Sequence, residues 1–167
     1  MTVARQLYPD RETLMRDLAG LVADQLRAAI ATKQRATLAV PGGTTPAPFL
    51  AALSEADLNW SAVTVMLTDE RVVPELSPRS NTRLIRETLM QNRAAEAHLL
   101  HFHAVGSGIE LILDAIRGRV AAALPLDVTV LGMGADMHTA SLFPGAPELA
   151  EALAADAPDI VAVRPPD

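Results

Sequence analysis

Three short segments of this sequence combine glycine with hydroxyl, carboxylate, guanidinium or imidazole groups. They are residues 41–46 (PGGTTP), 68–71 (TDER) and 132–139 (GMGADMHT). Each directly follows a short run of aliphatic and β-branched residues that is typical of a buried strand. In an open parallel sheet, ligands bind outside the carboxyl ends of the strands. We therefore expect the three segments to meet at one edge of a sheet and to form a single site.

The first of these segments has the composition of an anion-binding loop. Gly42 and Gly43 allow a sharp turn and a close approach of the backbone to a ligand. Thr44 and Thr45 add hydroxyl donors at the expected start of a helix, where the helix dipole favours negative charge. The segment lacks the spacing and the lysine of a nucleotide P-loop. A tight strand-to-helix turn capped by Thr45 fits the same residues, so both interpretations stay open.

The third segment places a carboxylate, Asp136, two residues before an imidazole, His138. Such a histidine can act as a general base near neutral pH, although a structural role is an alternative. A dinucleotide-binding fingerprint is disfavoured, because Met137 stands where that motif needs its third glycine. Backbone amides at the start of the segment could also face a ligand; they belong to Gly132, Met133 and Gly134.

The second segment brings three charged residues, Asp69, Glu70 and Arg71, directly after a buried strand. Charged groups are costly there unless they are paired or lie in a wet cleft, which favours a functional site. Arg71 could bind a phosphate or stabilise an oxyanion through its planar set of donors. The alternative is an Asp–Arg pair that only closes the end of the sheet.

A metal site is not expected. His101 and His103 would point to the same side of a strand and His98 lies nearby, but no further ligands complete a coordination sphere. The absence of cysteine excludes disulfides, thiolate metal sites and a cysteine nucleophile.

The elements that must position these groups alternate between short aliphatic runs and longer segments of helical period. The runs predict strands at residues 37–40, 63–67, 99–104, 127–131 and 159–163. The alternation predicts one α/β domain over residues 1–167, with a mostly parallel, open, Rossmann-like sheet and helices on both of its faces.

Four helices are expected between the strands. Asp10 is expected to cap the first helix, and Thr45 the second, which has Pro46 at its first position. The third helix is expected to begin near Ser80 or Asn81, and Pro125 is expected to end the fourth. The first helix is expected to bury one apolar stripe, made of Leu14, Leu18, Leu21, Val22 and Leu26.

The chain has 167 residues and a mass of 17.7 kDa, which suits one packed core. Its formal charge is −6 and it has no dense basic cluster, so neither a nucleic acid nor an anionic membrane surface is an expected partner. The N-terminus lacks the apolar stretch of a signal peptide, and glycines and prolines interrupt the longest uncharged stretch, residues 36–54. We expect no transmembrane helix, a cytoplasmic location, and a monomer or weak homo-oligomer.

The motifs in all three segments resemble those of the 6-phosphogluconolactonases of the pentose phosphate pathway. The matching stretches are VPGGTTP at 40–46, LTDERVVP at 67–74, SPRSN at 77–81 and LGMGADMHTASLFPG at 131–145. Their order and spacing agree with the family. These lactonases share an α/β fold with glucosamine-6-phosphate deaminases, but Arg71 after Asp69 and Glu70, and residues 139–144 after His138, favour the lactonase side.

By this resemblance, the reaction is hydrolysis of 6-phospho-D-glucono-1,5-lactone to 6-phospho-D-gluconate, with no metal or organic cofactor. His138 would deprotonate the water that attacks the C1 carbonyl, and Asp136 or Asp69 would orient the imidazole or hold sugar hydroxyls. Arg71 and the amides of residues 132–134 would stabilise the oxyanion or bind phosphate. The other expected phosphate ligands are Gly42, Gly43, Thr44 and Thr45, with Asn81 as a weaker candidate.

The sequence departs from the family pattern in two respects. Members of the family usually continue beyond the point where this chain ends, so it resembles the N-terminal two-thirds of such an enzyme. It also has Met137 where many relatives have glycine. Two other functions stay open: an isomerising deaminase of an amino sugar phosphate, and a non-enzymatic sugar-phosphate-binding domain. The second would carry a DNA-binding helix-turn-helix ahead of the fold, for which this N-terminus has no room.

Overall fold

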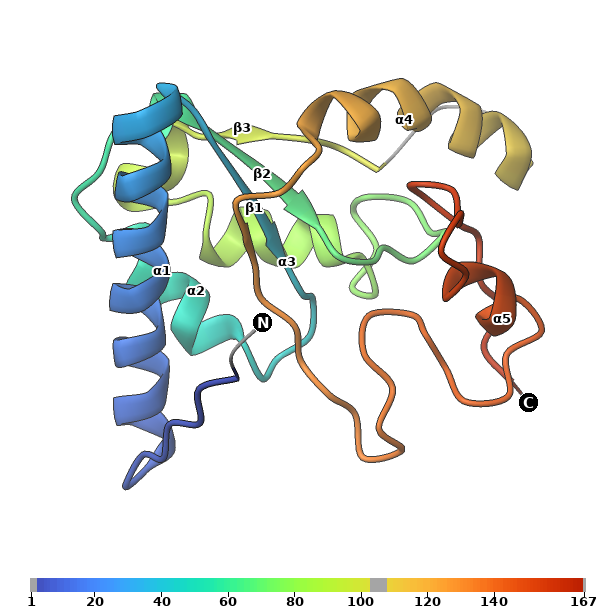
Figure 1. The fold of residues 1–167 in the computed structure, drawn as a ribbon, viewed down its shortest axis with the longest axis horizontal. Coiled ribbons are helices and arrows are strands. Elements are labelled where there is room, and N and C mark those ends of the chain that lie inside the picture. Colours follow the sequence, from blue (N-terminus) through green and yellow to red (C-terminus); the bar gives the residue numbers. More distant parts are fainter. Residues whose placement is uncertain (1–2, 103–107, 167) are drawn as a thin grey trace.

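Four parallel strands form the sheet, in the spatial order β3-β2-β1-β4 (Figure 1). The strands are β1 (Ala36–Val40), β2 (Val63–Leu67), β3 (His98–Leu99) and β4 (Val128–Thr129). The computed structural model describes residues 3–102 and 108–166. The parallel, open α/β architecture predicted from the alternation of elements is confirmed.

Two of the predicted strands are shorter than expected. β3 is paired only over His98–Leu99, and β4 only over Val128–Thr129. Both lie at the two edges of the described sheet, where each has a neighbour on one side only. The last two residues of the predicted strand 99–104, His103 among them, lie outside the described residues.

The prediction of a fifth strand at residues 159–163 is wrong. In the described part of the chain, this segment pairs with no strand of the sheet. Ile160 packs instead against the apolar cluster around Ala39 and Met66. The aliphatic run therefore marks burial, whereas a strand also needs a neighbouring strand to pair its N–H and C=O groups.

Helices cover both faces of the sheet, as predicted. On one face lie α1 (Arg11–Lys33), α2 (Ala47–Ser54) and α3 (Asn81–Thr88), and on the other lies α4 (Ile109–Ala123) (Figure 1). The short helices η1 (Trp60–Ala62) and η2 (Asn92–Glu96) precede β2 and β3, and the short helix α5 (Leu149–Ala152) lies in the segment after β4. No helix in the described residues is long and apolar enough to cross a membrane.

Strand residues alternate between the two cores because successive side chains of a strand point to opposite faces. Leu38 and Val40 of β1 belong to the larger core under α1, α2 and α3. Ala39, between them, packs with Met66 of β2 against Val120 on the inner side of α4. The two layers of helices therefore hold the central strands from both sides.

Two of the predicted helix caps are confirmed and one is wrong. The Asp10 carboxylate accepts the amide of Thr13 at 2.7 Å at the start of α1, and Ser80 Oγ accepts the amide of Arg83 at 3.2 Å at the start of α3. Thr45 does not cap α2: the first helical carbonyl is that of Pro46, and no side chain caps the helix. A proline at the first turn removes one of the amides that a cap would satisfy.

The buried side of α1 also differs from the predicted leucine stripe. Leu21 is 44% exposed. The buried residues of this helix are Ala19, Val22, Ala23, Leu26 and Ala29. Alanines let the helix lie close to its neighbours, so small residues define this packed face as much as large ones.

The strand order creates a topological switch point beside β1. The chain moves from β1 to β2 and β3 on one side, and then returns to place β4 on the other side of β1. Ligands of open α/β sheets bind in the crevice at such a point, outside the carboxyl ends of the strands. The segments that follow β1 and β4 are residues 41–46 and 132–139, both of which sequence reasoning assigned to the site.

Asp127 holds β4 against β1. One carboxylate oxygen of Asp127 accepts the amide of Thr37 at 3.0 Å, the other accepts Lys33 Nζ at 2.5 Å, and the amide of Asp127 donates to Thr37 Oγ1 at 2.9 Å. Burial by itself would raise the pKa of Asp127, but the hydrogen bonds from Lys33 and Thr37 outweigh it and hold this pKa below its ordinary value. The carboxylate is therefore ionised and bonded at neutral pH.

We predict that Asp127→Ala lowers the free energy of unfolding by about 1–3 kcal/mol at pH 7, because the amide of Thr37 loses its acceptor. Since the folded pKa is depressed, this contribution is complete above the ordinary pKa of 3.8 and is lost as pH falls through the lower folded value. Urea unfolding at neutral and acidic pH measures it. Asp114→Ala, which removes an exposed ion pair with Arg117 on α4, is the control and should change stability by less than about 1 kcal/mol. Equal effects of the two substitutions would contradict the prediction.

Candidate active site

A chain of contacts joins the three loops at the carboxyl edge of the sheet. Ser141 Oγ donates a 2.8 Å hydrogen bond to Asp69 Oδ2, which links the loop after β4 to the loop after β2. Asn81 Nδ2 donates to the carbonyl of Asp69 at 2.9 Å. The Asn81 side chain also lies against the loop after β1, since a Cβ on Gly42 would be 2.0 Å from Asn81 Cγ. The three segments therefore lie at one edge of the sheet.

His138 and Asp136 form a direct hydrogen bond in the loop after β4. The distance between His138 Nδ1 and Asp136 Oδ1 is 2.5 Å, and the backbone amide of His138 lies 3.4 Å from the same oxygen. The side-chain bond with His138 is the main reason that the pKa of Asp136 lies below its ordinary value. The ionised carboxylate of Asp136 accepts a hydrogen bond from Nδ1–H of a neutral imidazole, which leaves Nε2 as the basic atom of the ring.

A tight turn holds this pair in place. The amide of Gly134 donates to the carbonyl of His138 at 2.8 Å, and the amide of Met137 donates to the carbonyl of Gly134 at 3.0 Å. Thr139 Oγ1 donates to the carbonyl of Gly132 at 2.7 Å. The amide of Gly134 is thus already bonded within the turn. Of the three amides expected to face a ligand, those of Gly132 and Met133 stay candidates.

The imidazole of His138 lies against an aromatic ring. Its centroid is 4.7 Å from that of Phe143, with the two rings tilted by 42°. The side chain of His138 is 31% exposed. The ring is therefore partly packed against Phe143 and partly exposed.

The turn requires left-handed backbone at a residue that is not glycine. Met137 has φ +68°, in the region that favours glycine, and the residue is 74% exposed. Exposure means that the methionine gains little from burial to offset this strain. The departure from the family's glycine, noted from the sequence, therefore has a direct conformational consequence.

Glu70 organises the loop after β2 and does not face the solvent as a free charge. Its carboxylate accepts the amides of Asn81 at 2.8 Å and Thr82 at 2.7 Å, and the hydroxyl of Ser80 at 3.2 Å. Burial alone would raise the pKa of Glu70, but hydrogen bonds from Thr82, Asn81 and Arg71 outweigh it and lower this pKa below its ordinary value. Glu70 thus binds the loop to the start of α3.

Asp69 and Arg71 do not pair with each other to close the sheet, which was the alternative left open by the sequence. Asp69 bonds Ser141, and Arg71 Nη1 donates to the carbonyl of Arg79 at 3.0 Å. Arg71 is exposed, and no ion pair holds its guanidinium within residues 3–102 and 108–166. Its remaining donors are available for an anion.

Asn81 has a structural place in the site. It is 3% exposed, and its amide nitrogen is bonded to Asp69, as described above. It separates the loop after β1 from the loop after β2 and contacts both. A direct contact between Asn81 and a phosphate stays a prediction from the sequence.

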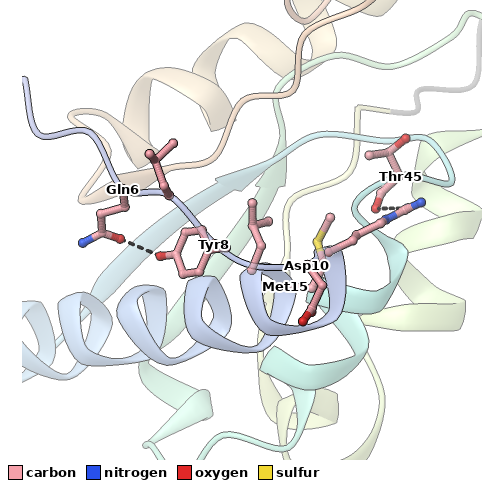
Figure 2. A pocket seen from close by; sticks show the side chains of 8 residues that line it. Gln6, Tyr8, Asp10, Met15 and Thr45 are labelled. Atoms are coloured by element: carbon pink, nitrogen blue, oxygen red, sulfur yellow. Dashed lines mark hydrogen bonds between the residues drawn. The ribbon is translucent and has the colours of Figure 1, made fainter.

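The loop after β1 is exposed over residues 43–45, and its role in anion binding stays a prediction from the sequence. Gly43 has φ +92°, and Gly43, Thr44 and Thr45 are exposed. Figure 2 shows an open cleft between α1 and the segment before it, with Thr45 at one end and Gln6 at the other. The carbonyl of Thr45 accepts a 3.0 Å hydrogen bond from Arg11 Nη2, drawn there as a dashed line.

The histidines near β3 do not form a metal site in the part of the chain that can be described. His98 is in β3 and His101 follows it, whereas His103 lies outside the described residues. Within the described residues, no group of three or more His, Asp or Glu side chains is arranged to hold a metal ion.

Two residues that the sequence did not assign to the site contact its loops: Ser141 and Arg11. Glu70 lies in the predicted segment 68–71, but no individual role was predicted for it. Ser141 lies inside the longest of the matching motifs, so its place in that motif was a usable signal. The contact of Arg11 with Thr45 spans 34 positions, and no local pattern predicts it.

Comparison with known proteins identifies the family. The profile described as glucosamine-6-phosphate isomerases/6-phosphogluconolactonase matches residues 9–167. The chain belongs to this family. The resemblance drawn from the three motifs is thereby confirmed, and so is the fold that it implied.

Similar members of the family are named 6-phosphogluconolactonase. The protein from Mesorhizobium japonicum is 51% identical over 150 residues, which cover 87% of this chain and 62% of that protein. The protein from Rhizobium meliloti is 44% identical over 154 residues, which cover 92% of this chain and 66% of that protein. The crystal structure of the Shewanella baltica 6-phosphogluconolactonase superposes with a TM-score of 0.90 at 38% identity, covering 95% of this chain and 68% of that one. The chain thus spans about two-thirds of the length of these relatives.

We predict that Gly134→Ala separates His138 from Asp136. A Cβ on Gly134 would lie 2.3 Å from His138 Cε1 and 2.7 Å from Asp136 Oδ1, too close for either atom to stay in place. NMR resonances of the His138 imidazole should shift strongly in this variant. Gly132→Ala is the matched control, because a Cβ there meets nothing within 4 Å. Unchanged His138 resonances in Gly134→Ala would show that the turn does not hold the pair as described.

We also predict that Met137→Gly does not destabilise the protein, whereas Met133→Gly does. Glycine at position 137 relieves left-handed strain of about 1–2 kcal/mol, against an entropic cost of about 0.5–1 kcal/mol. Met133 has no positive φ and is similarly exposed, at 75% against 74%, so glycine there brings only the cost. Denaturant unfolding of both variants measures the difference. A greater loss at position 137 than at position 133 would contradict it.

Proposed function

We propose that this protein hydrolyses 6-phospho-D-glucono-1,5-lactone to 6-phospho-D-gluconate, a step of the oxidative pentose phosphate pathway. The observation that carries the proposal is the 2.5 Å bond between His138 and Asp136 at the switch point of the sheet. It supplies an oriented base next to a loop suited to phosphate. The names of the relatives, at 44–51% identity, support the choice of substrate.

His138 acts as the general base in this proposal. Asp136 accepts Nδ1–H, so Nε2 can take a proton from a water molecule as its oxygen attacks C1 of the lactone. The C1 carbonyl becomes a tetrahedral oxyanion. When this intermediate collapses, the bond between C1 and the ring oxygen breaks, and Nε2 returns the proton to the ring oxygen, which leaves as a hydroxyl. The carboxylic acid that forms then ionises.

Donors around the site have distinct places in the proposal. The amides of Gly132 and Met133 and the guanidinium of Arg71 are candidates to stabilise the oxyanion. The exposed loop of residues 43–45 would receive the phosphate at the start of α2, where the helix dipole favours negative charge. No metal or organic cofactor takes part in these steps, because a lactone is an ester activated enough for base catalysis and positioning.

Asp69 takes a positioning role in this scheme. Its carboxylate bonds Ser141, three residues after His138, and not the imidazole itself. Of the two carboxylates considered from the sequence, Asp136 therefore orients the base directly, and Asp69 acts through the loop that carries it.

We predict that His138→Ala lowers kcat/KM for the lactone by about 10²–10⁴-fold, as expected for the loss of a general base. The measurement is formation of 6-phosphogluconate above the spontaneous background. His98→Ala, an exposed histidine in β3, is the control and should retain the wild-type rate. An unchanged rate in His138→Ala would remove histidine from the mechanism.

The substrate is tested with the wild-type protein. Glucosamine 6-phosphate is offered in parallel and released ammonia is measured, because the same fold carries isomerising deaminases. Ammonia release without lactone hydrolysis would overturn the proposed function in favour of the deaminase. No turnover of either compound would favour a binding domain.

A further inference from the structure

Arg11 lies outside the predicted motifs but contacts residues 41–46, the predicted anion-binding loop. It is the first residue of α1, and its Nη2 donates a 3.0 Å hydrogen bond to the carbonyl of Thr45. Within the described residues, no other side chain hydrogen-bonds the backbone of residues 41–46. The loop has two exposed threonines and a glycine at φ +92°, so a contact from another element helps to fix its conformation.

The chemistry of Arg11 suits this place. A guanidinium stays charged at all relevant pH values and offers several N–H donors in one plane, of which the carbonyl of Thr45 uses one. Among the described residues, no carboxylate forms an ion pair with Arg11. Its acidic neighbour Asp10, which lines the same cleft, is bonded to the amide of Thr13. The guanidinium of Arg11 therefore lies at the edge of the loop without a direct ion pair in the described residues.

We propose that Arg11 is a positioning residue for phosphate recognition: it fixes the backbone of residues 43–45 through the carbonyl of Thr45 and adds a positive charge beside them. The inference rests on the proposed function insofar as the anion is the phosphate of the substrate. Arg11 lies at the start of α1, more than thirty positions before Thr45 and outside the three motifs. Substrate affinity would therefore depend on a residue that the motifs do not include.

Arg16 provides a matched control on the same helix. It is also exposed, with 67% of its side chain accessible, and its nearest acid is Asp17 at 3.8 Å. It lines a second cleft along α1 that does not include Thr45. Replacing Arg16 therefore changes the net charge of the protein as much as replacing Arg11 does, without touching the loop.

The test compares Arg11→Gln, Arg11→Lys and Arg16→Gln with the wild-type protein. Arg11→Gln is expected to raise KM for the phosphorylated lactone roughly tenfold with little change in kcat, since it removes binding shared by ground state and transition state. The unphosphorylated glucono-1,5-lactone should be hydrolysed equally by wild type and variant. Arg11→Lys keeps the charge and can still donate to the carbonyl of Thr45, so it should recover most of the affinity, and Arg16→Gln should match wild type.

Three outcomes would overturn the inference. They are equal KM values for Arg11→Gln and Arg16→Gln, an equal loss on both lactones, and no recovery in Arg11→Lys. Thermal unfolding of each variant separates a folding defect from a loss of affinity.

Binding of inorganic phosphate, followed by calorimetry, keeps this inference separate from the proposed function. If the wild-type protein does not hydrolyse the lactone, the proposed function fails. Weaker phosphate binding by Arg11→Gln than by Arg16→Gln would still support the role of Arg11, and equal binding would refute it.

Discussion

The hydrogen bond between Ser141 and Asp69 is the contact on which the geometry of the site depends. The long segment after β4 is stabilised mainly by bonds within its own turns, and Ser141 anchors it to the neighbouring loop at 2.8 Å. A partly buried hydrogen bond to a carboxylate contributes roughly 1–3 kcal/mol, enough to hold such a loop in one position. Through Asp69 and Asn81, the position of His138 is tied to that of the loop after β1.

Acidic side chains carry much of this architecture. Glu70 binds the start of α3, Asp127 binds β4 to β1, and Asp136 orients His138. Each carboxylate accepts a backbone amide or a basic side chain, and in each case these bonds hold the pKa below its ordinary value. The formal charge of the chain is −6, and several of its carboxylates therefore serve as hydrogen-bond acceptors within the fold. The groups that would meet an anionic substrate are backbone amides, a helix start and exposed arginines.

The comparisons establish the family and the fold, whereas the hydrogen bonds of the site distinguish individual atoms. Similarity over residues 9–167 establishes the family and, with a TM-score of 0.90 to a solved member, the fold. It does not distinguish Nδ1 from Nε2 of His138, or the amide of Gly134 from that of Met133. Those distinctions follow from hydrogen bonds, because a donor already bonded within a turn is not available to a reacting oxygen.

Local patterns in the sequence were sufficient to predict the parallel sheet with its strands β1 and β2, and the helix caps Asp10 and Ser80. They were also sufficient to predict which three segments lie at the carboxyl edge of the sheet. These features depend on side-chain period, cap chemistry and chain topology, which neighbouring residues determine. The predictions failed where a partner distant in the chain decides the outcome. Residues 159–163 have the composition of a strand but pair with none within the described chain, and Thr45 bonds Arg11 through its carbonyl and caps no helix.

Local sequence patterns therefore indicate which groups are available for chemistry and at which edge of the sheet they lie. The contacts of each group depend on the folded chain: Asp136 bonds the imidazole, Asp69 bonds Ser141, and Glu70 supports a helix. The difference arises from the range of the interactions. Helical and strand periods act over a few neighbouring residues, whereas a hydrogen bond between residues 72 positions apart exists only after the whole sheet has brought its loops together.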